Sequence, residues 1–207
     1  MVGFGVVGFE LWLGLALFFL TGLLARYTDA FEKNKRYVHF TLISAVAYGF
    51  GGGVLAAASP AFAAVVFGIV LGVVFGGKVD SRQHHVAVAV LFLTALLLNT
   101  APLFIPLAIL CAASFLDEDL HESISCEFKR SKIAARRLAR GRVRGGARDG
   151  KRAFSPIKAL LGSRVLVELA ALVLGLFTGA WVFLACVLAF DAGCYFAPKL
   201  GKWFPEH

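Results

Sequence analysis

Seven apolar stretches recur along this chain, each separated from the next by polar residues or by a short turn. Apolar runs of this kind, repeated through a chain, indicate membrane-spanning helices rather than the buried helices of one soluble domain. The predicted spans cover residues 3–25, 38–58, 61–77, 86–98, 103–116 and two halves of 165–198. We therefore expect an all-α fold: a polytopic integral membrane helical bundle of about seven transmembrane helices.

The last apolar stretch, residues 165–198, is too long for one span. A helix of these 34 residues would measure about 50 Å at about 1.5 Å per residue. The hydrocarbon core of a bilayer is only about 30 Å thick. We therefore predict two short helices that turn near Thr178-Gly179, and the alternative is a single long tilted helix, which would give six spans.

The composition agrees with a protein of the cell membrane that crosses it several times. The chain is 59% apolar and 16% charged, whereas roughly a quarter of the residues in soluble domains are charged. The first apolar stretch lacks the basic start and small-residue cleavage site of a signal peptide, so it is predicted to be a retained span. Residues 1–207 form one predicted transmembrane domain, interrupted by a basic cytoplasmic loop at 117–163.

Charge is distributed unevenly between the two sets of loops. The loops after the first, third and fifth spans carry the Lys and Arg residues, whereas the turns after the second, fourth and sixth spans carry no charge. Basic loops remain on the cytoplasmic side of a membrane. We therefore expect the N-terminus outside and the C-terminus in the cytoplasm, with three in-out-in hairpins as possible pseudo-repeats.

The basic loop holds twelve of the chain's 21 Lys and Arg residues, between Lys129 and Lys158. Such a run beside a membrane span attracts anionic lipid headgroups. The predicted lipid or phosphate contacts are Lys129, Arg130, Arg136, Arg137 and Arg140. Because this location accounts for the net charge of +8, membrane lipids are the predicted partner and nucleic acid is not. An oligomer is compatible with the sequence.

The spacing of the cysteines limits which metal or disulfide sites are possible, and the spacing of the glycines indicates how the helices pack. Cys111, Cys126, Cys186 and Cys194 have no C-x-x-C spacing, so neither a disulfide framework nor a cysteine-only zinc site is predicted. Gly68, Gly72 and Gly76 recur every four residues and share one helix face. Glycines on one face allow a neighbouring helix to approach closely.

Three acidic residues, Glu10, Glu168 and Asp191, lie within apolar stretches. A carboxylate in hydrocarbon is energetically costly, so each is a candidate for function. Asp191 is the strongest candidate, because it lies eight residues before Lys199 and a short helix places it below the headgroups. Glu168 follows Arg164 by one helical turn, so it is expected to reach the interface or to pair with that Arg. Glu10 lies apart from any other candidate.

An Asp-x3-His spacing occurs twice, at the predicted inner ends of the third and fifth spans. Asp80 precedes His84 by four residues, and Asp117 precedes His121 by four, which places each pair on one helix face. The neighbouring His84 and His85 point in different directions, so at most one of them faces such a site. If these ends meet in the bundle, Asp80, His84, Asp117, His121 and Asp191 form a site for a divalent metal ion. A solvated acidic cap is the alternative.

These residues leave three functions open. The first is a transporter-like membrane protein that binds a divalent metal or another cation at the cytoplasmic side. The second is a membrane-embedded, metal-dependent enzyme acting on a lipid or lipid-phosphate, in which the same residues hold the metal or act as acid and base. The third is a scaffold whose basic loop binds a partner.

A two-aspartate pattern adds a fourth alternative. Tyr27-Thr28-Asp29 after the first span, with Gly76-Gly77-Lys78-Val79-Asp80 later in the chain, resembles the pattern of prepilin-peptidase-type membrane proteases. The resemblance covers two short pieces of the chain and implies an aspartyl membrane protease with Asp29 and Asp80 as the catalytic pair. That family usually has Gly directly before the second Asp, where this chain has Val79.

Overall fold

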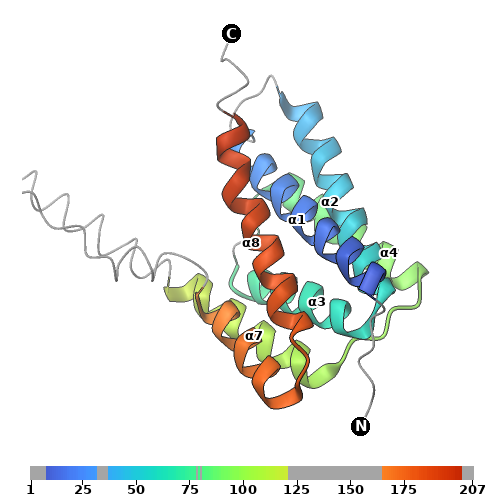
Figure 1. Cartoon of the computed structure of the whole chain (residues 1–207). Coiled ribbons are helices and arrows are strands. Elements are labelled where there is room, and N and C mark those ends of the chain that lie inside the picture. Colours follow the sequence, from blue (N-terminus) through green and yellow to red (C-terminus); the bar gives the residue numbers. More distant parts are fainter. Residues whose placement is uncertain (1–7, 32–36, 78, 80, 121–164, 202–207) are drawn as a thin grey trace, which may run out of the picture.

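A computed structural model describes residues 8–31, 37–77, 79, 81–120 and 165–201 (Figure 1). Throughout these residues the fold is all-helical, with seven helices and no strand. The helices are α1 (Gly8–Phe31), α2 (Val38–Ala58), α3 (Pro60–Phe75), α4 (Arg82–Leu97), an unlabelled helix at 104–120, α7 (Val165–Thr178) and α8 (Val182–Gly201).

Each of the seven predicted apolar stretches corresponds to one helix. The division of residues 165–198 is confirmed, because α7 ends at Thr178 and Gly179 follows with φ +70°. Glycine adopts this left-handed conformation without steric cost, so the chain can reverse there. The alternative of one long tilted helix is therefore wrong.

Two of the described helices are long and apolar enough to cross a membrane, Glu10–Phe31 and Val38–Ala58. The remaining apolar helices α3, α4, α7 and α8 contribute shorter apolar segments of 10–17 residues.

Two helices extend further than the sequence pattern predicts. α1 continues to Phe31, past the apolar run that ends at Ala25. In this last part, the hydroxyl of Thr28 donates to the carbonyl of Leu24 at 2.9 Å and to Ser44 Oγ of α2 at 3.1 Å. Tertiary contact therefore keeps a polar segment helical. Likewise the helix at 104–120 includes Asp117, where the basic loop was expected to begin.

Glycines set the closest helix contacts. α1 packs most extensively on α8 (Figure 1), where a Cβ at Gly22 would collide with the backbone of Phe190 and one at Gly193 with the backbone of Phe19. α2 and α4 meet similarly, because a Cβ at Gly49 would collide with the backbone of Ala87. Close backbone approach through small residues is the usual basis of helix packing in membranes.

The predicted glycine face on α3 packs against the helix at 104–120. A Cβ on Gly68 would lie 2.7 Å from Leu110 Cβ, and one on Gly72 would collide with Ser114. A Cβ on Gly76 would lie 3.4 Å from Glu118 Cβ. The hydroxyl of Ser114 also donates to the carbonyl of Ile69 at 3.1 Å. The expectation that these glycines admit a neighbouring helix is confirmed.

The core lies around α3 and is entirely apolar at its centre. Phe62, Val65 and Phe183 are fully buried there. Phe18 of α1 meets Phe62 edge-to-face, with ring centroids 5.6 Å apart. Outside this core, large apolar side chains face outward all round the molecule, including Phe177, which is 87% exposed.

Candidate functional site

A cavity of about 680 Å³ lies where α1, α3, α4, α7, α8 and the helix at 104–120 converge, with Tyr48 of α2 also in its wall. This volume falls in the range of roughly 300–1,000 Å³ that is typical of small-molecule sites. The acidic side chains lining it are Asp29, Asp117, Glu118, Glu168 and Asp191. Among the described lining residues the basic ones are Arg26 and His84, so the carboxylates predominate.

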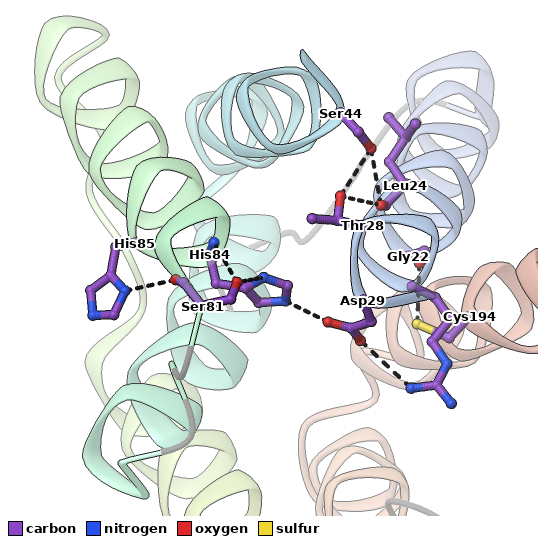
Figure 2. A network of polar contacts seen from close by, with 10 residues as sticks. Gly22, Leu24, Thr28, Asp29, Ser44, Ser81, His84, His85 and Cys194 are labelled. Carbon is purple, nitrogen blue, oxygen red and sulfur yellow. Dashed lines mark hydrogen bonds and ion pairs between the residues drawn. The ribbon is translucent and has the colours of Figure 1, made fainter. Parts of the chain in front are cut away.

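His84 is held between α4 and α1 by contacts at both of its ring nitrogens (Figure 2). Its Nδ1 lies 2.9 Å from Ser81 Oγ, and its Nε2 lies 2.9 Å from Asp29 Oδ1. Ser81 is the N-cap of α4, and its Oγ also accepts the backbone N–H of His84 at 3.2 Å. An N-cap residue has a fixed position relative to its helix. The imidazole is therefore fixed in the cavity wall.

His85 turns away from the cavity. Its Nδ1 lies 2.7 Å from the carbonyl oxygen of Ser81, on the opposite side of the helix start from Asp29 (Figure 2). The expectation that the adjacent histidines point in different directions is confirmed, and His84 is the one that faces the cavity.

Asp29 also contacts Arg26, one helical turn before it on α1. The guanidinium Nη1 lies 3.5 Å from Asp29 Oδ2, with side chains 53% and 43% exposed. Because surface ion pairs contribute only about 0–1 kcal/mol, this pair does little for stability. Among the residues that the structure describes, Asp29 thus forms ion pairs with Arg26 from its own helix and with His84 from α4.

Asp117 caps a helix that lies far away in the sequence. Its two carboxylate oxygens accept the backbone N–H groups of Leu166 and Val167, at 3.0 and 2.9 Å. These residues open α7, where free N–H groups and the helix dipole favour a negative charge. Asp117 is 9% exposed. It therefore joins the helix at 104–120 to α7 at the edge of the cavity.

The structure brings together three of the five predicted ligand residues: His84, Asp117 and Asp191 line this one cavity. Asp80 and His121 lie outside the described residues, as does the basic loop with Lys129, Arg130, Arg136, Arg137 and Arg140. Within the part of the chain that the structure describes, no group of three or more His, Cys, Asp or Glu is placed to hold a metal ion.

Sequence reasoning underrated two carboxylates. Asp29 was a candidate only through the resemblance to the protease pattern. The second aspartate of that pattern, Asp80, lies outside the described residues. Asp29 lies just after the apolar part of α1, and Asp117 lies just after the apolar part of the helix at 104–120. This shared position could have marked Asp29 as a candidate from the sequence. Glu168 was expected to reach the membrane interface or to pair with Arg164, which lies outside the described residues, and the structure places Glu168 in the lining of the cavity. Glu10 is exposed on α1 away from the cavity.

A second, apolar cavity of about 90 Å³ adjoins the first. The two cavities share six lining residues, which form the boundary between them: Ala25, Tyr48, Ile69, Val70, Val88 and Phe190. The residues that line only the second cavity include Phe18, Val66 and Leu91. Thr21, which carries a hydroxyl group, also lines it. An apolar cavity between α1, α2, α3 and α4 therefore lies next to the acidic one, and the two share part of their walls.

Comparison of the chain with protein-family models, with curated proteins and with solved structures found no match.

Proposed function

We propose that this chain is a multi-pass membrane protein that binds a cation in the acidic cavity. The observation that carries the proposal is the convergence of Asp29, Glu118, Glu168 and Asp191 from four helices on one chamber. A cavity lined mainly by groups of one charge sign raises the local concentration of ions of the opposite sign. Transport of the bound cation is the activity that we favour.

The membrane part of the proposal is supported by the exposed apolar side chains. Phe50 on α2, Leu93 on α4 and Leu169 on α7 are all more than half exposed. Soluble monomers rarely leave large contiguous apolar surfaces facing water, whereas such side chains are at no disadvantage against lipid. The proposed orientation places the cavity, with its charged helix ends, on the cytoplasmic side.

For a divalent metal, the absence of a described group of three side chains placed to hold the ion directly supports a hydrated ion. Mg²⁺ usually keeps several waters and binds through one or two carboxylates. Asp191 and Glu168 are the proposed contacts, with Asp29 and Glu118 neutralising charge across the chamber. Asp117 is assigned a positioning role, since both of its oxygens already accept backbone N–H groups.

A second candidate function, a membrane enzyme acting on a lipid or lipid-phosphate, is supported by the apolar cavity beside the acidic one. Such an enzyme would place the reacting group among the carboxylates and the apolar chain in the second cavity. Because the apolar core around Phe62 and Phe183 is fully buried, transport would require the helices to rearrange, whereas such an enzyme would not.

The test is calorimetric titration of the purified protein in detergent with MgCl₂ and with MnCl₂. We expect saturable binding of at least one ion and at least a tenfold loss of affinity in Asp191→Asn and Glu118→Gln. The matched control is Asp119→Asn, because Asp119 is exposed on the same helix and does not line the cavity. Equal losses in Glu118→Gln and Asp119→Asn, or no binding of any cation by the wild type, would refute the proposal.

A further inference from the structure

We infer that phospholipid headgroups on one side of the membrane dip toward its centre beside the first turn of α4, where Arg82 and His85 are exposed. The inference rests on the membrane part of the proposed function, and it does not depend on which cation the cavity binds. It assigns a lipid-contacting surface to the start of α4 and names its partner, the headgroups of a locally thinned bilayer.

The register of α2 against α4 sets the depth of this turn. The two helices pack side by side (Figure 1). They run in the same direction, because Gly49 packs on Ala87 and, further along both helices, Gly53 packs on Thr94. These contacts join residue numbers that differ by 38 and by 41. His85 is therefore level with positions 44–47 of α2.

The outward face of α2 is apolar on both sides of this level. Phe40 is 63% exposed, Ile43 is 66% exposed and Phe50 is 56% exposed. α2 is also one of the two described helices that are long and apolar enough to cross a membrane. If this face marks the hydrocarbon, His85 lies four to seven residues, or about 6–10 Å at about 1.5 Å per residue, nearer the membrane centre than Phe40.

The first turn of α4 is polar at this depth. Arg82 and His85 are exposed, and His85 turns away from the acidic cavity (Figure 2). A charged or polar side chain in hydrocarbon is costly, and local thinning of the bilayer is one way in which this cost is lowered. Lipid phosphates also accept charge-assisted hydrogen bonds from a guanidinium. Headgroups drawn in beside Arg82 and His85 therefore satisfy both side chains.

The length of α4 agrees with a thinned bilayer. Its 16 residues measure about 24 Å, whereas the 21 residues of α2 measure about 31 Å, close to the hydrocarbon thickness of about 30 Å. Leu96 and Leu97, at the other end of α4, are 78% and 75% exposed. Because that end is apolar, the missing length falls at the polar start of the helix.

The dip has a consequence for the acidic cavity. The hydroxyl of Thr28 donates to Ser44 Oγ at 3.1 Å, so the next residue, Asp29, lies at nearly the same level of α2 as His84. Both Asp29 and His84 line the cavity. The displaced headgroups therefore bring the aqueous boundary to the depth of this polar pair, instead of leaving the pair at the depth of the hydrocarbon.

The experiment measures the depth of matched positions in the full-length protein in phosphatidylcholine vesicles. His85→Cys and Val46→Cys are each labelled with a thiol-reactive fluorophore, and Val46 is the control because it is exposed on α2 at the same level. Nitroxide quenchers are placed on the lipid headgroup or midway along the acyl chain. The unsubstituted protein, labelled in the same way, gives the background from the four native cysteines.

We expect the headgroup nitroxide to quench position 85 more strongly than the chain nitroxide does, and the reverse at position 46. The ratio of headgroup to chain quenching should differ at least about threefold between the two positions, because the headgroup regions are distinct from the hydrocarbon core. Arg82→Cys and Ile43→Cys form a second pair with the same expectation, so the comparison does not depend on the folding of one variant.

The outcomes separate this inference from the proposed function. Chain quenching at both positions would show that the headgroups do not dip, while membrane insertion stands. If neither quencher reaches position 85 but the chain nitroxide quenches position 46, a water-filled crevice replaces the headgroups and the inference is wrong. If the chain nitroxide fails to quench position 46, α2 does not face hydrocarbon, and the membrane part of the proposed function is wrong as well.

Discussion

His84 Nε2 lies 2.9 Å from Asp29 Oδ1 and thereby joins the start of α4 to the end of α1 at the wall of the acidic cavity. The two residues are 55 positions apart, and Ser81 fixes the imidazole from its other side. Asp29 is 43% exposed and His84 is 23% exposed. Such a contact orients side chains for binding more than it stabilises the fold.

The first prediction concerns this contact. His84→Gln and Asp29→Asn should each lower the stability of the protein by no more than about 1 kcal/mol, since partly exposed pairs contribute little. Cation affinity should fall about tenfold in each. Thermal unfolding and calorimetric titration measure the two effects separately. His85→Gln is the matched control, because His85 faces away from the cavity, and a comparable loss of affinity there would contradict the assignment.

The second prediction concerns the Asp117 cap. Asp117→Ala leaves the N–H groups of Leu166 and Val167 without their acceptors. Leaving a buried donor unsatisfied costs about 1–3 kcal/mol, so unfolding should occur at a clearly lower temperature. Asp117→Asn keeps one acceptor and should lose less. Asp119→Ala, on the exposed side of the same helix, should unfold like the wild type; a drop equal to that of Asp117→Ala would argue against capping.

The third prediction concerns the packing of α3 on the helix at 104–120. Gly72→Ala places a methyl group against Ser114 Cβ and within 2.7 Å of the carbonyl oxygen of Cys111. Overpacking of this kind costs about 1–3 kcal/mol, and the loss should appear in thermal unfolding. Gly76→Ala is the milder comparison, since its nearest contacts are at 3.3–3.4 Å. If Gly76→Ala destabilises as much as Gly72→Ala, the loss does not come from this contact.

The fourth prediction tests the membrane proposal through Phe50, which is 56% exposed near the middle of α2. In a bilayer, Phe50→Arg places a charge in hydrocarbon, at a cost of about 2.5–3.5 kcal/mol. In water, an exposed substitution stays within about ±0.5 kcal/mol. Membrane fractionation and thermal unfolding should therefore show a large loss, and Asp119→Arg, at a helix end, should show none. Normal yield and stability of Phe50→Arg would count against membrane insertion.

Part of the candidate site could be predicted from the sequence. His84 and Asp117 were found because each adjoins an apolar stretch, and Asp191 was found because it lies within one; both are local signals in the sequence. Whether they hold a cation stays a prediction. The role of Asp117 could not be foreseen, because its partners are backbone amides of α7, which no side-chain pattern reveals. The place of Glu168 in the cavity lining could not be foreseen either, because it depends on how α7 packs against the other helices.

The sequence by itself determined the number and the approximate position of the helices in the described part of the chain. Apolar length, the glycine at position 179 and the Ser59-Pro60 turn act over a few residues, so their effect can be read locally. Only the tertiary structure decided which helix ends meet. Glycine contacts such as Gly193 on Phe19 and Gly72 on Ser114 set how closely the helices pack, and this packing brings Asp29 to His84 and places the acidic cavity beside an apolar one.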